Sequence, residues 1–496
     1  MTSGLRLAVF CAAAATIAFA ADADTRLADA VQRQDRAAVH ALLAKQVDVN
    51  AAQVDGTTAL AWAAQNDDLE TARRLLDAGA DVSVANRYGV MPLSLAAANG
   101  SGAMIRLLLD HGANAKAALP GGETVLMTAA RTGKPDAVKA LIAAGAEVNA
   151  KEEKRGQTAL MWAAAEGNFE AIEALLAAGA DLHARLESGF TPLLFAVREG
   201  RLEAVQTLVQ AGASVNETIE SPKRVPGGKG PRAGTTALIL AALNAHYELA
   251  AWLLDNGADP NAIGPGYTAL HTVTWVRKSG VGDNDPAPEG SGNMTSLQFG
   301  KKLIDSGADI NARMTKKVNV GLTSLNTMGA TTFLLAARTA DAELMRYLAA
   351  LGADPKIPTA EGANAMIVAA GLGTRSPGED AGTEPEVVEA LQAALDLGCD
   401  INAVDNNGES AMHGAAYKNL PGAVDFLASH GANVQIWNRK NKQGWTPLTI
   451  AEGYRFGNYK PSPETAEAIR RALIAAGVTP PPPLPPLSAP AATEGR

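Results

Sequence analysis

The sequence predicts an all-α solenoid of about twelve helix–turn–helix units joined by polar finger turns, and three regularities point to this fold class. A glycine followed by a small residue recurs with steps of 33, 33, 34 and 33 through Gly79, Gly112, Gly145, Gly179 and Gly212. The series continues with steps of 45, 50, 45, 46, 33 and 46 through Gly257, Gly307, Gly352, Gly398, Gly431 and Gly477. Within each unit, alanine and leucine return at fixed positions. A period of this size indicates stacked supersecondary units that share one continuous core.

The unit spanning residues 156–181 shows what each position does. Thr158 stands where a first helix begins, because its hydroxyl can accept a hydrogen bond from an otherwise unpaired backbone amide. Leu160 and Ala163 belong to an apolar stripe, in which small side chains let helices approach closely. Gly167 separates the two helices, and Gly179 supplies the left-handed cap that ends the second. The pattern therefore predicts two short antiparallel helices per unit.

This pattern resembles the ankyrin repeat, a turn plus two antiparallel helices with a Thr-Pro-Leu-His signature. The nearest matches are Thr191-Pro192-Leu193 and Thr268-Ala269-Leu270-His271. Aligned on this signature, first helices are expected to start at Thr25, Thr58, Met91, Thr124, Thr158, Thr191, Thr236, Thr268, Thr331, Asn364, Ser410 and Thr446. The family histidine survives only at His271 and His413. Units with methionine there, such as those of Met127 and Met161, are expected to lose a polar clamp and gain apolar contact.

The solenoid is expected to span residues 24–477, with atypical capping units near 24–51 and 437–477. Gln46 occupies the glycine cap position of the first unit, as expected for a terminal repeat. The proline run that opens at Pro480 predicts that residues 478–496 form an extended, disordered tail.

Insertions interrupt the repeat mainly in its second half. The distance from helix start to cap glycine is usually 21, but it is 39 from Thr268, 34 from Asn364 and 31 from Thr446. These three insertions are predicted between paired helices. The step between units grows from 12 to 24 after Gly212 and again after Gly307, which predicts two extended finger turns. Because insertions map to loops, we expect functional specialisation here.

Residues 1–20 read as a secretory signal peptide. Arg6 is their one charged residue, residues 7–20 are apolar or neutral, and small residues precede an acidic stretch. The alternative is an uncleaved anchor, but the run is short against the ~20 residues that span a bilayer. We expect cleavage, no membrane span afterwards, and an exported protein that is periplasmic or extracellular. Likeness to exported bacterial ankyrin proteins favours a bacterial origin.

Charge and cysteine content exclude further classes. The chain has 52 acidic and 43 basic residues, a net charge of −9, which becomes −10 once Arg6 is removed. An acidic balance disfavours nucleic acid, whose binding needs a basic footprint. Cys399 would be the single cysteine of the mature chain, so no internal disulfide can form. We expect a monomer whose partner is another protein.

The resemblance implies that a register just after the histidine position faces the concave groove of the solenoid. The partner-binding candidates on the first helices are Trp62, Trp162, Phe195, Leu240 and Leu335, with Trp275 further along its helix. Aromatic side chains supply much of the binding energy at protein interfaces, although the same residues could fill gaps between repeats. Lys223 and Arg224, in the finger turn after Gly212, are candidates for docking an acidic partner, the alternative being a solvated loop.

No catalytic, cofactor-binding or metal-ligating constellation is predicted. Cys399 falls at the small residue after a cap glycine, where a packed thiol is expected. An enzyme would need a site built from the insertions, in residues 280–292 and 372–383. The sequence therefore favours a non-catalytic scaffold that binds a partner protein through its concave face and finger turns. The alternatives are a secreted effector that binds a host protein and an enzyme built on the insertions.

Overall fold

The structure is a computed structural model that describes residues 24–220, 232–278, 288–319, 323–455 and 461–483. Within these ranges it holds 25 α-helices and three isolated β-bridges, so the predicted all-α class is confirmed. Twelve helix pairs follow one another, with one short extra helix, α23, in a finger turn. The predicted signal peptide, residues 1–20, lies outside the described residues.

Eight helices precede residue 155. They are α1 Arg26–Gln32, α2 Arg36–Ala44, α3 Ala59–Gln65, α4 Leu69–Asp77, α5 Pro92–Asn99, α6 Gly102–Asp110, α7 Val125–Thr132 and α8 Pro135–Ala143. The next ten are α9 Ala159–Glu166, α10 Phe169–Ala177, α11 Pro192–Arg198, α12 Leu202–Gln210, α13 Ala237–Leu243, α14 Tyr247–Asp255, α15 Ala269–Arg277, α16 Ser296–Asp305, α17 Thr332–Arg338 and α18 Ala342–Ala350. The last seven are α19 Ala365–Ala369, α20 Glu384–Asp396, α21 Ala411–Lys418, α22 Pro421–Ser429, α23 Val434–Trp437, α24 Pro447–Ala451 and α25 Pro463–Ala475.

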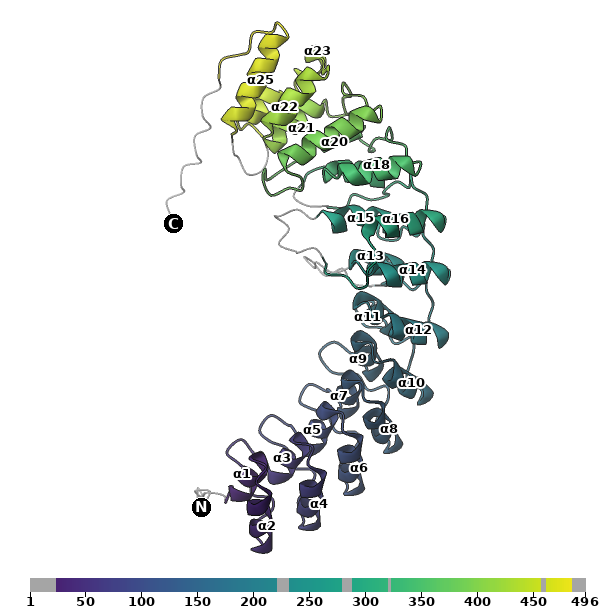
Figure 1. The fold of residues 1–496 in the computed structure, drawn as a ribbon, viewed down its shortest axis with the longest axis vertical. Coiled ribbons are helices and arrows are strands. Elements are labelled where there is room, and N and C mark those ends of the chain that lie inside the picture. Colours follow the sequence, from purple (N-terminus) through teal and green to yellow (C-terminus); the bar gives the residue numbers. More distant parts are fainter. Residues whose placement is uncertain (1–23, 221–231, 279–287, 320–322, 456–460, 484–496) are drawn as a thin grey trace, which may run out of the picture. The chain divides into compact units, whose positions relative to one another are not determined.

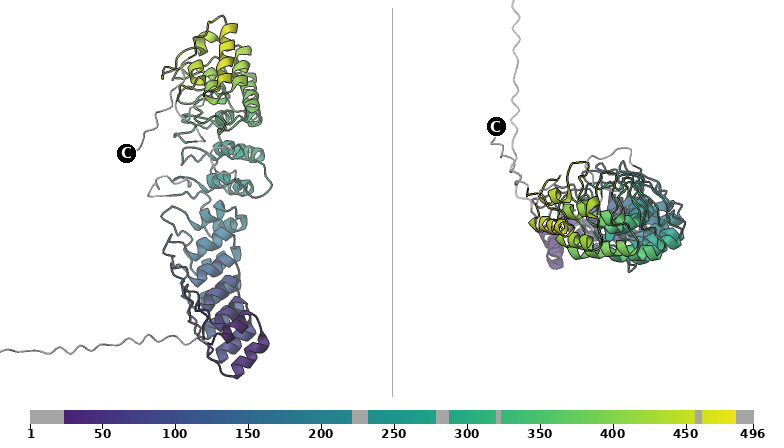
Figure 2. Two further views of the ribbon diagram at one scale, coloured as in Figure 1. Left: turned by 90° about the vertical axis from the view of Figure 1, so that its left-hand side faces the viewer. Right: turned by 90° about the horizontal axis from the view of Figure 1, so that it is seen from above.

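The chain divides into two compact units. Unit 1 comprises residues 1–154 and 177–179, and unit 2 comprises residues 155–176 and 180–496. Within each unit the first helices of successive pairs form one layer and the second helices form another (Figures 1 and 2). Each first helix packs against its own partner and against the next first helix, as α3 does with α4 and α5. The core therefore runs as one spine between the two layers of each unit.

Every predicted first-helix start is the N-cap residue of its helix. The Thr58 hydroxyl accepts a hydrogen bond from the Ala61 amide at 3.3 Å, which satisfies one of the orphan donors of α3. Met91 has no such side chain, and Pro92 at the first helical position of α5 removes one donor instead. The sequence therefore located these starts correctly.

The second helices end as the glycine period predicts. Gly179 adopts a φ of 85°, and the Ala180 amide that follows donates back to the Leu175 carbonyl at 2.9 Å. Gln46 adopts the same left-handed conformation with a φ of 53°, although it carries a Cβ. The first repeat thus keeps the left-handed conformation of the cap without its glycine.

Asparagine side chains tie the bases of successive finger turns together. In unit 1, Asn50 Nδ2 donates to the Gly79 carbonyl at 3.3 Å, and its Oδ1 accepts from the Asp81 amide at 2.8 Å. In unit 2, Asn261 makes the same two bonds, to Gly307 at 2.8 Å and from Asp309 at 2.7 Å. We call this pair of bonds the asparagine clasp.

The insertions lie where the sequence places them. Residues 278–295 separate α15 from α16, residues 370–383 separate α19 from α20, and residues 452–462 separate α24 from α25. The second of these, here called the α19–α20 insert, is anchored by a buried ion pair between Arg338 and Asp380 at 2.6 Å. Thr374 also donates to Asp380, at 3.1 Å.

The C-terminal end of the solenoid is closed by α24 and α25, which pack on α21 and α22. Trp437 of α23 is 3% exposed, and its indole N–H donates to the Ala432 carbonyl at 3.3 Å. Residues 478–483 follow α25 without helix, and Arg470 donates to the Pro481 carbonyl at 2.6 Å. The rest of the predicted tail lies outside the described residues.

Candidate functional site

The first-helix face of unit 1 carries an ordered tryptophan. The half-buried Trp62 on α3 donates its indole N–H to Gln53 Oε1 at 2.8 Å. The Gln53 amide then donates to Asp29 Oδ1 at 2.7 Å and to Gln32 Oε1 at 2.9 Å. This network holds one edge of the indole while part of the ring stays accessible. Such a fixed amphipathic ring is suited to a protein contact, because little side-chain entropy remains to be lost on binding.

Two finger tips of unit 1 expose large apolar side chains. Val54 is fully exposed and Tyr88 is 60% exposed, in successive finger turns, although Val54 occupies the position of Arg87 and Tyr88 that of Asp55. The Arg87 guanidinium lies 4.8 Å from the Tyr88 ring centroid and donates to its hydroxyl at 2.7 Å. Sequence reasoning missed both residues. The available signal was an apolar residue at the tip of an otherwise polar turn, beside Asp55 and Gly89.

Unit 2 carries a second aromatic group near its start. Trp162 on α9 is half-buried, whereas Phe195, at the same register of α11, is 5% exposed. The Phe195 and Phe190 ring centroids lie 5.3 Å apart, and the Arg198 guanidinium stands over both rings at about 5 Å. Trp162 therefore remains a surface candidate, while Phe195 is mainly a packing residue.

Trp275 is half-buried near the C-terminal end of α15. Its ring meets Tyr267 edge-on, with centroids 5.1 Å apart. Burial raises the pKa of Tyr267, and the nearby Arg232 guanidinium opposes that shift. The two basic candidates, Lys223 and Arg224, lie outside the described residues.

Leu240 and Leu335 need correction as surface candidates. Their side chains are 0% and 1% exposed, so both are part of the core and offer a partner no contact area. They sit on α13 and α17, the helices that follow the two extended finger turns. Those turns bury apolar residues of their own, including Ile219, Met314 and Leu325. In these two repeats, the position that we expected to face the groove is buried. This agrees with the alternative that such residues fill gaps between repeats.

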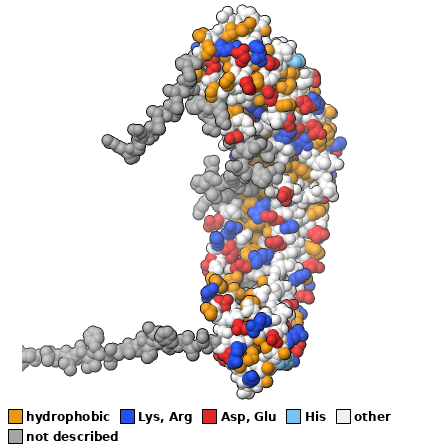
Figure 3. All heavy atoms as spheres, turned by 60° about the vertical axis from the view of Figure 1, so that its left-hand side comes forward, with side chains coloured by type: hydrophobic (Ala, Val, Ile, Leu, Met, Phe, Trp, Pro, Cys, Tyr) orange, Lys and Arg blue, Asp and Glu red, His pale blue; other side chains and the backbone are white. Residues whose placement is uncertain are grey.

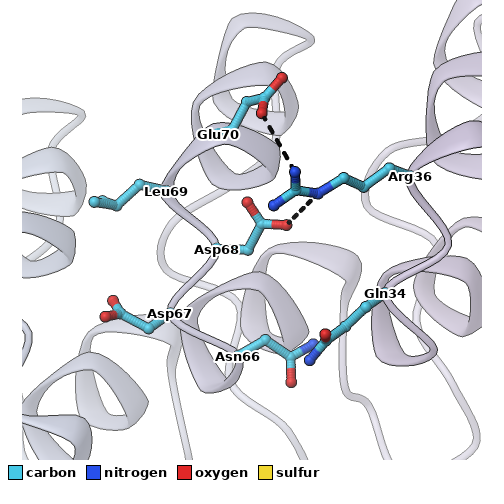
Figure 4. Close-up of a pocket in the computed structure, with 7 residues that line it drawn as sticks. All are labelled: Gln34, Arg36, Asn66, Asp67, Asp68, Leu69 and Glu70. Carbon is cyan, nitrogen blue, oxygen red and sulfur yellow. Dashed lines mark ion pairs between the residues drawn. The ribbon is translucent and has the colours of Figure 1, made fainter.

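A hollow of about 440 Å³ lies in unit 1 between the α1–α2 and α3–α4 turns (Figure 4). It is lined by Gln34, Arg36, Asn66, Asp67, Asp68, Leu69 and Glu70. The Arg36 guanidinium points toward both carboxylates, 3.8 Å from Asp68 and 3.9 Å from Glu70. Asp68 Oδ1 also accepts from the Thr71 amide at 3.0 Å, which caps α4. Three of its charged side chains, Arg36, Asp68 and Glu70, thus already have partners, and a single leucine leaves it with little apolar lining.

The described residues hold no cluster of three or more His, Cys, Asp or Glu side chains placed to bind a metal ion. Cys399 is 5% exposed, and its thiol donates to the Pro355 carbonyl at 3.3 Å. Burial raises its pKa to about 11, so the thiolate that a nucleophile requires is disfavoured at neutral pH. Cys399 is the packed thiol that the sequence predicted.

Surface charge is mixed on the face drawn in Figure 3, where Lys and Arg side chains are interspersed with Asp and Glu. Across the described ranges, no helix combines the length and the apolar character that crossing a membrane requires.

Comparison with protein families agrees with this geometry. The family profile described as Ankyrin repeats (3 copies) matches residues 27–119, 93–185, 126–219, 187–264 and 381–460, together more than half of the chain. Residues 265–380 lie between the last two matches and contain both the longest insertion and one extended finger turn. No curated protein matches the chain. The capped helix pairs, the left-handed turns and these matches together lead to one conclusion: the chain belongs to the ankyrin-repeat family.

Proposed function

We propose that this protein is an exported, non-catalytic scaffold that captures a partner protein through its first-helix face and finger turns. Ankyrin repeats generally serve as protein–protein interaction scaffolds and are typically non-catalytic. The observation that carries the proposal is that unit 1 exposes Val54 and Tyr88 on successive finger turns and holds the half-buried Trp62 in a hydrogen bond on α3. Isolated exposed apolar residues are common, but here two of them stand on neighbouring finger turns that are joined by the Arg87 amide donating to the Asp55 carbonyl.

The test is affinity capture from native envelope extracts. Trp62→Ala and Trp162→Ala, made singly, are expected to weaken capture of a specific partner by at least about tenfold, because buried tryptophans at interfaces contribute about 2 kcal/mol or more. Trp252→Ala is the matched control, since this half-buried tryptophan lies on the second helix α14. The captured protein is identified by mass spectrometry.

Equal capture by all three variants would show that Trp62 and Trp162 do not contact the partner, provided that each variant unfolds at the wild-type denaturant midpoint. A partner recovered only from cytosolic extracts would contradict the exported location that the leader predicts.

A further inference from the structure

Three finger turns of unit 2 lie side by side. They are the extended turns at residues 212–236 and 307–331 and the short turn at residues 257–268 between them. Gly234 and Gly264 meet backbone to backbone, so that a Cβ added to Gly234 would come within 2.9 Å of the Gly264 carbonyl carbon. On the other side, the Thr315 amide donates to the Gly266 carbonyl at 3.0 Å. The short turn therefore holds the two long ones together.

Exposed basic side chains gather on these turns. Arg232 stands two residues from the Gly234 contact, and Lys316 lies against Gly266 with its ammonium donating to the Gly264 carbonyl at 3.3 Å. Lys317 follows directly and is exposed as well. We call Arg232, Lys316 and Lys317 the basic finger patch. Over the described ranges, none of the three takes part in an ion pair.

The acidic groups of the same turns are engaged elsewhere. Glu217 accepts a hydrogen bond from the Thr191 hydroxyl at 2.5 Å, and burial raises its pKa. Asp259 and Asp309 sit at the bases of their turns, where each accepts the amide two residues on, at 2.8 and 2.9 Å. Glu220 is exposed, but its backbone packs against Gly189 of the preceding turn. Over the described ranges, none of these four carboxylates forms an ion pair with the patch, which is a local positive region on a protein whose net charge is −9.

An aromatic pair adjoins the patch. Tyr267 ends the short turn close enough to Arg232 for the guanidinium to act on its pKa, and its ring contacts the half-buried Trp275. Arginine and tryptophan are both enriched at the energetic centres of protein interfaces. A ligand bound at the patch could therefore contact both its basic side chains and the accessible part of the Trp275 ring.

We propose that the basic finger patch binds an acidic, glutamate- or aspartate-rich segment of the partner protein. This inference rests on the proposed function and adds the chemistry of the partner to it. Complementary charge supplies orientation and speeds encounter, whereas the apolar finger tips of unit 1 offer no such selectivity.

The experiment titrates the full-length mature chain with a fluorescently labelled poly-glutamate peptide. Wild-type protein is expected to bind, and rising salt is expected to weaken that binding. The combined variant Arg232→Glu, Lys316→Glu and Lys317→Glu should weaken it by at least about tenfold, because like charges then face the peptide. The neutral variant Arg232→Gln, Lys316→Gln and Lys317→Gln should show a smaller loss, and it serves as the readout if charge reversal prevents folding.

The matched control reverses Arg73, Arg106 and Lys139, which are exposed on second helices of unit 1. It changes the net charge equally, so peptide affinity within about twofold of wild type is expected if location matters. Equal losses in both triple variants would overturn the proposal, as would an unaffected patch variant. Tighter patch-dependent binding of single-stranded oligonucleotide or of phosphatidylserine vesicles than of the peptide would overturn it too.

The experiments distinguish failure of the scaffold proposal from failure of the patch proposal. Should the patch variant capture the partner as wild type does while Trp62→Ala does not, the scaffold function stands and the patch is excluded. If the wild-type protein captures no partner, the scaffold function fails, and the peptide titration alone decides the chemistry of the patch.

Discussion

His271 and His413 keep the family histidine that other repeats replace, for example with Met127, Met161, Leu194 and Ile239. His271 Nδ1 accepts from the Thr268 amide at 3.2 Å, and its Nε2 faces the Ala330 carbonyl at 3.2 Å. His413 repeats this arrangement with Ser410 and the Arg439 carbonyl, at 3.2 and 3.1 Å. Each ring thus joins a helix start to the next finger turn, which is the polar clamp that the family resemblance implies.

Burial makes these clamps sensitive to acid. It lowers the pKa of both histidines from 6.5 to about 4, so the folded state holds them neutral. Their contribution to the free energy of unfolding is complete above pH 6.5 and is lost as pH falls towards 4, because the unfolded chain then binds more protons. Each histidine accounts for about 3 kcal/mol over that range at about 1.4 kcal/mol per pKa unit.

The variant His271→Met and His413→Met should therefore flatten the fall in stability between pH 6.5 and 4. Denaturant unfolding measured across this range provides the comparison, with Met127 and Met161 as precedents for methionine at this position. A variant whose stability falls as steeply as that of wild type would show that other groups control the acid response.

The α19–α20 insert shows how an element outside the repeat becomes part of the fold. Arg338 and Asp380 are 7% and 4% exposed at their side chains, and the buried Lys418 ammonium donates to the Ala381 carbonyl of the same insert. Burial lowers the pKa of Lys418 to about 8, an effect that Asp380 opposes and Arg338 reinforces. A loop that buries several charges stays closed only while their partners are present.

Asp380→Asn should loosen this insert, because it leaves the Arg338 guanidinium buried without a carboxylate, at a cost of about 3–5 kcal/mol. Trypsin reports the effect directly, since Arg375 is exposed within the insert and should be cleaved faster. The double variant Arg338→Met and Asp380→Leu should recover much of the loss. Wild-type cleavage rates for Asp380→Asn would show that the ion pair does not hold the insert.

The repeat elements could be predicted from the sequence because each depends on local chemistry. A threonine that caps a helix and a glycine that takes the left-handed turn act through local contacts, so starts such as Thr158 and caps such as Gly179 were located to the residue. The fates of Leu240, Leu335 and Asp380 depend on which distant segment covers them. No period encodes the fold of an extended turn, so the burial of these residues could not be derived. Of the basic finger patch, the sequence indicated only the first extended turn, where Lys223 and Arg224 were the candidates, and it gave no indication of Lys316 or Lys317.

At the scale of the whole chain, successive repeats form a stack, and the apolar surface at an end of the stack has to be covered by a capping repeat. Deleting residues 446–496 removes α24 and α25 and uncovers the apolar surfaces of α21 and α22. The shortened protein should self-associate, which light scattering would detect as a rise in mass with concentration. Deleting residues 484–496 alone is the control and should leave the mass unchanged. A shortened protein that remained monomeric would argue against a capping role for the last unit.

The asparagine clasp lets finger length vary freely. Asn50 closes the base of the turn at residues 46–58, and Asn216 closes the base of the turn at residues 212–236 with equivalent bonds to Gly257 and Asp259. The clasp joins neighbouring turns at their bases in the same way for the short turn and for the extended one. Foreign recognition loops could accordingly be grafted at Val54, which makes this chain a natural display framework.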